Sequence, residues 1–190
     1  MAVTSIQHKL TYQDLRRLPD DGLRHEILDG VHFVSAAPFP PHQRISGRLH
    51  LRMGAFVEQY SLGEVFYAPV DVLLSKHDIV EPDLFFIASG REAIVAATQV
   101  KGTPDLVVEI LSRSTRSRDL GIKRDIYERA GVQEYWLLDP KRAHAIVYRR
   151  QSLGSPTFLP PLLLTAAADD RLTTPLLPGL EISLREVLAP

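Results

Sequence analysis

The chain has 190 residues, 45% of them hydrophobic, and its 22 Lys and Arg against 23 Asp and Glu leave a formal charge of −1. This length and hydrophobic content are enough for one core, so we expect a single domain over residues 1–190. The balanced charge excludes a broadly basic surface that coats nucleic acid, but it leaves room for a local basic groove. The absence of cysteine excludes disulfides, zinc–thiolate sites and a thiol nucleophile.

The N-terminal sequence MAVTSIQHKLTYQDL lacks the unbroken apolar segment of a secretory signal. No apolar run approaches the ~18 residues of a membrane helix. We therefore expect a soluble, cytoplasmic protein with no membrane partner. Within LTYQDLRRLPDDG, Thr11 is a suitable N-cap, Asp14 stands at the capping-box position and Pro19 is a stop signal, which together predict a short helix.

The next stretch, RHEILDGVHFVS, predicts a β-hairpin. The pair Asp29–Gly30 suits a tight two-residue turn. In that register Leu28 pairs with Val31 and Glu26 pairs with Phe33, on a face that is apolar except for Glu26.

After the break AAPFPP, a helix is expected from about His42 to Tyr60, with an apolar stripe formed by Ile45, Leu49, Phe56 and Tyr60. Strand-like runs follow: EVFYA, VDVLLS, DLFFIA, DLVVEIL, EYWLLD and HAIVYRR. The stretch GREAIVAATQV, between the third and the fourth of these runs, is ambiguous and could form a short helix.

A second helix is predicted over Asp119–Ala130, with Gly131 as its stop. The tail TTPLLPGLEISLREVLAP predicts extended structure and a last turn packed on the core. One mixed α/β domain accounts for this order of elements.

Lys123 is out of place on the predicted helix. At about 100° per residue, it falls in the middle of the apolar side with Ile126 and Tyr127, whereas Arg124 and Glu128 fall on the opposite side. A lysine exposed to solvent would belong with the latter two, so Lys123 is expected to point toward the sheet. Tyr127 shares this face, either as a core residue or as a wall of a site.

Glu109 is equally out of place, because it interrupts an apolar strand. A buried carboxylate is costly unless something compensates it. Strand alternation places Glu109 on one face with Val107 and Leu111. Because the helix after a strand packs back across the sheet, Glu109 and Lys123 could meet. A purely structural buried ion pair is the alternative interpretation.

Asp83 starts another apolar strand, in VEPDLFFI, on the face of Phe85 and Ile87. An Asp at this position can also face solvent or cap a turn. With Glu26 as a fourth member, the set would combine hard oxygen ligands for Mg²⁺ with a lysine that holds or deprotonates the attacking water. This combination indicates metal-assisted hydrolysis of a phosphodiester.

Several stretches resemble the Uma family of restriction-endonuclease-like proteins, a group widespread in bacteria within the PD-(D/E)XK nuclease superfamily. The matching stretches cover most of the chain: HEILDG, GEVFYAPVDVLLS, VEPDLFFI, PDLVVEILSRSTRSRDLGIKRDIYERAGVQEYWLLDP and LLPGLEISL.

The resemblance implies a restriction-endonuclease-like core of order α-β-β-β-α-β, a central mixed sheet flanked by helices, with an N-terminal helix and hairpin added. It implies a DNA endonuclease that uses Mg²⁺, for which Mn²⁺ could substitute. Asp83 and Glu109 would bind the metal, helped by the Ile110 carbonyl, Lys123 would position and activate the water, and Glu26 would support the metal or the lysine.

The chain departs from the superfamily pattern at Leu111, where the lysine two residues after Glu109 would stand. The resemblance implies that Lys123 supplies this lysine from the following helix. Arg113 also replaces a proline usual in the family. His42 matches a histidine common at the start of the core helix, although such a residue is more often a surface or capping group.

The loop RSTRSRD leads into a helix, where Arg113, Arg116 and Arg118 could contact DNA phosphates or simply be solvated. Small domains of this type often cut duplexes as homodimers, so by analogy we expect a homodimer. The alternative function is a non-catalytic module that binds nucleic acid or another partner and retains the nuclease fold.

Overall fold

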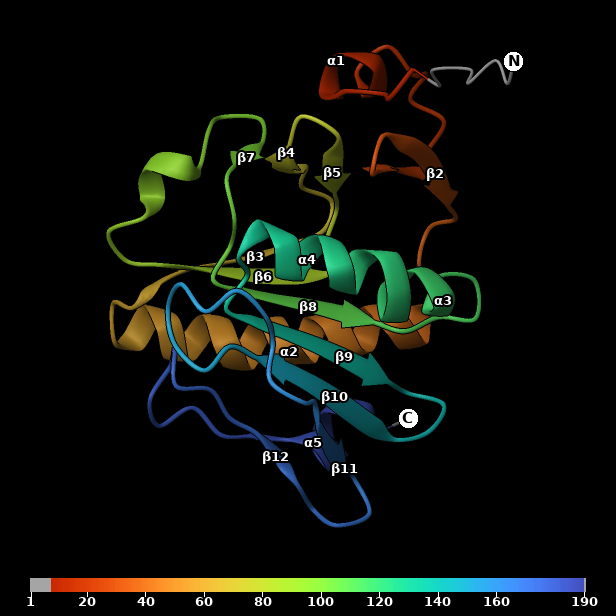
Figure 1. The fold of residues 1–190 in the computed structure, drawn as a ribbon. Helices are drawn as coiled ribbons and strands as arrows, with labels where there is room; N and C mark the ends of the chain where they lie inside the picture. The colour runs from red at the N-terminus through yellow and green to blue at the C-terminus, as the bar shows by residue number, and fades with distance from the viewer. Residues whose placement is uncertain (1–7, 190) are drawn as a thin grey trace, which may run out of the picture.

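The computed structural model describes residues 8–189 and is built around a six-stranded mixed sheet (Figure 1). Residues 1–7, part of the segment expected to lack a secretory signal, lie outside the described residues. The sheet has the order β11–β10–β9–β8–β6–β3, in which β8 and β9 are parallel and the other neighbours antiparallel. Its strands are β3 (Gly63–Tyr67), β6 (Leu84–Ala88), β8 (Leu106–Ile110), β9 (Glu134–Asp139), β10 (His144–Arg149) and β11 (Leu162–Thr165).

The two faces of this sheet are covered by different helices (Figure 1). Helix α2 (Pro40–Gln59) packs on one face, and its buried residues recur every three or four positions, at Ile45, Leu49, Met53 and Val57. Tyr60, expected to complete this stripe, is instead exposed because the helix ends at Gln59 and Tyr60 is its C-cap. Phe56, expected in the same stripe, is only partly buried.

The opposite face is covered by the segment that follows β8. In place of the single predicted helix it forms α3 (Arg116–Arg118), a π-helical turn η2 (Asp119–Lys123) and α4 (Arg124–Ala130). Gly131 ends α4 with φ 91°, the left-handed conformation that glycine adopts without strain, as predicted. Lys123 is buried in this segment, on the side that faces the sheet.

A second sheet, of order β2–β1–β5–β4–β7, lies beside the first (Figure 1). The hairpin pairs Leu28 with Val31 and Glu26 with Phe33, which confirms the predicted register. The short helix α1 (Tyr12–Leu15) also begins after Thr11 as predicted, and the Asp14 carboxylate accepts from the Thr11 backbone N–H. The strands of this sheet are β1 (Arg24–Leu28), β2 (Val31–Ser35), β4 (Val72–Ser75), β5 (Asp78–Val80) and β7 (Val100–Lys101).

The elements α2, β3, β6, β8, α4 and β9 follow the expected order α-β-β-β-α-β, so the predicted mixed α/β fold class is confirmed. The ambiguous stretch 90–100 contains a single 3₁₀ turn, η1 (Glu92–Ile94). Within residues 8–189, no helix combines the length and the apolar character needed to cross a membrane. The C-terminal part adds β12 (Arg171–Leu172), β13 (Ile182–Ser183) and α5 (Leu184–Leu188).

Candidate active site

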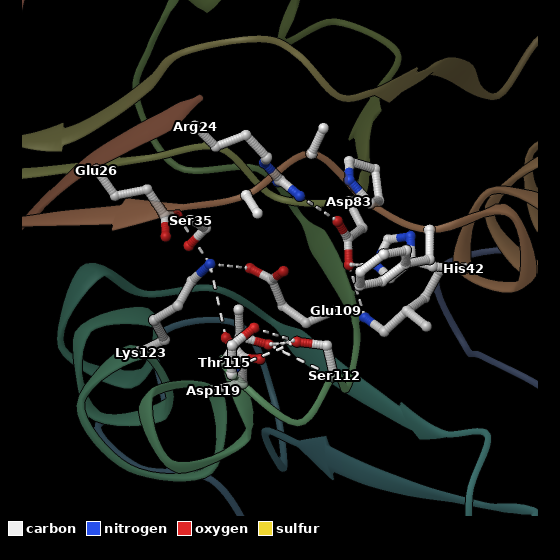
Figure 2. Close-up of a pocket in the computed structure, with 16 residues that line it drawn as sticks. Arg24, Glu26, Ser35, His42, Asp83, Glu109, Ser112, Thr115, Asp119 and Lys123 are labelled. Atoms are coloured by element: carbon white, nitrogen blue, oxygen red, sulfur yellow. Dashed lines mark hydrogen bonds and ion pairs between the residues drawn. The ribbon is translucent and has the colours of Figure 1, made fainter. Parts of the chain in front are cut away.

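A cavity of about 90 Å³ lies where β1, β6, β8 and η2 meet the start of α2 (Figure 2). All four residues predicted for the site line it, although they come from four separate elements. The charged groups on its walls are Arg24 and Glu26 from β1, Asp83 immediately before β6, Glu109 from β8, and Asp119 and Lys123 from η2.

Glu109 and Lys123 meet in this cavity. The Lys123 Nζ lies 2.5 Å from Glu109 Oε1 and 2.8 Å from Glu26 Oε1, and only 2% of the lysine is exposed. Strand alternation explains the approach, since Val107 and Leu111, on either side of Glu109, belong to the apolar cluster under α4. The Tyr127 hydroxyl donates to Glu109 Oε1 over 2.7 Å, but Tyr127 itself is a core residue and does not line the cavity.

Asp83 is held by three donors from three different elements. Arg24 Nη1 donates to Asp83 Oδ1 over 2.8 Å, while the Ile110 backbone N–H donates to Oδ2 over 2.8 Å. His42 Nε2, from the first turn of α2, lies 3.0 Å from the same oxygen. Asp83 is only 3% exposed, and these donors give its carboxylate a fixed orientation.

Glu26 links the hairpin to the site. Its Oε1 accepts from Lys123 and also from the Glu81 backbone N–H, over 3.0 Å. Asp119 lies one π-helical turn before Lys123, with 3.9 Å between its Oδ1 and the Lys123 Nζ. The lysine is consequently surrounded by three carboxylates (Figure 2).

Burial and neighbouring charges separate the protonation behaviour of these groups. Burial opposes ionisation of Asp83, but the His42 hydrogen bond and the Arg24 charge outweigh it and lower the pKa of Asp83 to about 2. Burial raises the pKa of Glu109 to about 8; the Lys123 charge opposes this rise and the Asp83 charge adds to it.

The lysine is held as a cation. Burial alone would lower the pKa of Lys123, but the adjacent Glu109 and Glu26 raise it well above its ordinary value. Burial likewise opposes ionisation of Glu26, yet the charge and hydrogen bond of Lys123 lower the pKa of Glu26. Lys123 can therefore donate hydrogen bonds at neutral pH and is a poor proton acceptor.

The donor set fits a divalent cation. When all are ionised, the four carboxylates of the cavity exceed Arg24 and Lys123 by two negative charges. Asp83 and Glu109 line one wall each, and in Figure 2 the Glu109 oxygen that Lys123 does not contact lies on the side of Asp83. Within residues 8–189, no three His, Asp or Glu side chains form a ready-made metal cage. Mg²⁺ does not require one, since it commonly takes one or two protein carboxylates and completes its shell with water and phosphate.

Two of the three loop arginines are engaged within the protein. Arg116 is ion-paired with Asp139, and Arg118 Nη2 donates to Ser35 Oγ over 2.5 Å while its guanidinium lies 5.3 Å from the Phe33 ring centre. Arg113 is exposed. None of the three contacts the carboxylates of the cavity, and their predicted phosphate contacts stay predictions.

Sequence reasoning did not assign Arg24 or Asp119 to the site. Arg24 lies two residues before Glu26, on the same face of the same strand, so strand alternation could have identified it. Asp119 precedes Lys123 by four residues, the spacing of neighbours on a helix face. His42, which the family resemblance had singled out, lines the cavity and contacts Asp83 instead of acting as a surface or capping group, although no local pattern predicts that approach because it depends on how α2 packs on the sheet.

Two comparisons with known proteins place the chain. The model of a family described as "Uma2: Putative restriction endonuclease" matches residues 12–185. A crystal structure of a "putative nuclease belonging to DUF820" from Anabaena variabilis ATCC 29413 is similar, with 18% sequence identity and a TM-score of 0.78 over 95% of this chain and 98% of that one. At this identity the structural likeness shows the fold alone. No curated protein matches the chain.

Proposed function

Because the chain belongs to the Uma2 family, whose description is "Putative restriction endonuclease", we propose that it is a metal-dependent endonuclease that hydrolyses DNA phosphodiester bonds. The observation that carries this proposal is the convergence of Asp83, Glu109 and Lys123 on one small cavity in which carboxylates outnumber basic side chains. Phosphodiester hydrolysis requires a bound cation, a positioned water and compensation of the charge that develops on the phosphate.

In this proposal Asp83 and Glu109 hold a divalent cation, Mg²⁺ or Mn²⁺, which when bound polarises the phosphate and lowers the pKa of coordinated water. Asp83 is prepared for this role because three donors fix its carboxylate. Arg24 and His42 act as positioning residues for Asp83.

Lys123 orients the attacking water and places a positive charge beside the phosphate. Its contacts with Glu26 and Glu109 keep it protonated, which supports a role as hydrogen-bond donor and charge partner and not as the base. Glu26 anchors the ammonium group from the second sheet. The substrate phosphate would therefore meet a lysine whose position is set from two sides.

The assembly is also part of the proposal. A homodimer would present two cavities and could cut both strands of a duplex, whereas a monomer would nick one strand at a time. Light scattering of the purified protein, alone and with DNA, measures the number of copies directly.

The test incubates the protein with supercoiled, linear and branched DNA in Mg²⁺ or Mn²⁺, beside Asp83→Asn and Lys123→Met. The matched control is Asp105→Asn, which alters another buried aspartate that pairs with an arginine (2.5 Å from Arg91) but lies outside the cavity. We expect the wild type and Asp105→Asn to cleave, and the two site variants to lose cleavage by several orders of magnitude.

Equal cleavage by the wild type and both site variants would remove support for the assigned residues. No cleavage of any substrate with either metal would instead favour a non-catalytic module that binds nucleic acid.

A further inference from the structure

A second cavity, of about 330 Å³, opens directly beside the candidate active site. The two cavities share Arg24, His42 and Asp83 in their walls, with Pro38 between them, so a ligand in the second cavity lies next to the candidate metal ligand. Its volume falls within the ~300–1,000 Å³ of pockets that bind small molecules. No step of the proposed hydrolysis uses this space.

The walls of the second cavity carry groups of the kinds that can recognise a nucleobase. Tyr67, at the end of β3, is 56% exposed, and His50 contacts its ring edge-on with 4.5 Å between ring centres. Gln43 and Ser46, from adjacent turns of α2, add an amide and a hydroxyl that can both donate and accept hydrogen bonds. Leu23 contributes an apolar side chain.

A further aromatic ring stands at the mouth of the first cavity. Phe39 lines that cavity yet is 77% exposed, the most exposed aromatic residue among the large hydrophobics of the described chain. Pro38 and Pro40 flank it and restrict the backbone, so little backbone freedom is lost when this residue binds a ligand. Exposed aromatic rings beside the candidate active site suit base stacking.

The depth of the first cavity restricts which DNA can reach it. Asp83 and Glu109 are each only 3% exposed. A paired duplex is a stiff rod with its bases stacked inside, so bringing one phosphate down to buried carboxylates requires the strand to leave the helical path. An unpaired nucleotide does this at the lowest cost, because no base pair has to be broken.

We propose that the second cavity binds the base of an unpaired nucleotide adjacent to the scissile phosphate, and hence that the substrate is single-stranded DNA or DNA with an unpaired nucleotide. This inference rests on the proposed function for the position of the scissile phosphate. Tyr67 stacks on the base, Gln43 and Ser46 face its edge, and Phe39 stacks on the neighbouring base at the mouth.

The experiment measures binding without cleavage, by fluorescence anisotropy in EDTA. The labelled DNAs are a short single strand, a fully paired duplex of the same sequence, and that duplex with one bulged nucleotide. We expect the single strand and the bulged duplex to bind ~10-fold or more tightly than the paired duplex, in keeping with the cost of extruding a paired base. Tyr67→Ala should weaken single-strand binding by roughly 5- to 150-fold, and Tyr67→Phe should retain it.

The matched control is Tyr60→Ala, which removes a tyrosine of nearly equal exposure, 55%, at the far end of α2. Circular dichroism verifies that each variant is folded. Phe39→Ala is a second test, on a residue outside the sheets, and should also weaken single-strand binding. Equal affinity for all three DNAs, or a loss in Tyr67→Ala no larger than that in Tyr60→Ala, would overturn the inference.

The two proposals fail separately. Tyr67-dependent binding of unpaired DNA without cleavage in any metal would retain the inference and reject the endonuclease. Metal-dependent cleavage of paired and unpaired DNA at equal rates would support the endonuclease and reject the inference that the second cavity selects unpaired DNA.

Discussion

Replacing Lys123 by methionine removes the only cation within contact distance of Glu26 and Glu109 among the described residues, while keeping a side chain of similar length. Breaking a buried ion pair by removing one partner costs ~3–5 kcal/mol, because the remaining charge is left uncompensated. For a protein of this size, each kcal/mol lowers the melting temperature by ~2–4 °C, so we expect a decrease of roughly 6–20 °C at pH 8.

The same variant should recover stability as the pH falls. In the wild type, Lys123 lowers the pKa of Glu26, so the stabilising contribution of Glu26 is present above its unfolded pKa and is lost as the pH falls through its folded pKa. Without the lysine, burial raises the pKa of Glu26 above the unfolded value, and the folded variant then binds the additional proton. The difference between wild type and variant should therefore be largest near pH 8 and much smaller near pH 5.

Urea unfolding at both pH values measures this difference. Lys101→Met is the control, because Lys101 is exposed and its replacement should change stability by less than ~0.5 kcal/mol. A loss in Lys123→Met below about 1 kcal/mol, or one of equal size at pH 5 and pH 8, would refute the reasoning, since an ordinary surface lysine behaves that way.

Three further outcomes are expected. Burial raises the pKa of Glu109, so the metal-free protein should lose stability as the pH rises from about 5 to 8. Mg²⁺ should therefore raise the melting temperature more at pH 8 than at pH 5. Equal shifts of the melting temperature at the two pH values would argue against Glu109 as a ligand. Tyr127→Phe leaves a buried Glu109 oxygen without its hydroxyl donor and should cost ~1–3 kcal/mol in urea unfolding, whereas a change under ~0.5 kcal/mol would contradict the contact. Gly131→Ala places a residue with a side chain in a left-handed backbone conformation and should cost ~1–2 kcal/mol. Gly121→Ala, with open space around its added carbon, should be tolerated. Equal decreases in the melting temperature of the two variants would contradict the left-handed conformation of Gly131.

Local patterns in the sequence were sufficient for much of the fold. The turn Asp29–Gly30 determined the hairpin register, and the run EYWLLD coincides with β9. The periodicity of the strand and of the helix also predicted that Glu109 and Lys123 could meet, because a charged residue on a buried apolar face needs a partner. These features depend on neighbours close in sequence or on one strand–helix unit.

The features missed depend on contacts between distant segments. Strand β5 is three residues long and exists because Ile79 pairs with both Ile27 and Leu73. Strand β11 is an edge strand in a proline-rich tail, with no alternating pattern of burial. The π-helical turn before α4 could not be read from a wheel drawn at 100° per residue, although Lys123 is buried as that wheel predicted.

The two carboxylates proposed as metal ligands are held in different charge states. Asp83, whose pKa lies at about 2 because Arg24 and His42 compensate its burial, is ionised at neutral pH, whereas Glu109 can carry a proton up to about pH 8. Protonation of Glu109 reduces the excess negative charge that the empty cavity would otherwise carry, which spares the fold part of the repulsion between buried carboxylates. A divalent cation would displace that proton, so cation binding and proton release are coupled at this site. Lys123 takes part in the same balance, since it stabilises the ionised form of Glu109 without having to occupy the place of Leu111 on the strand.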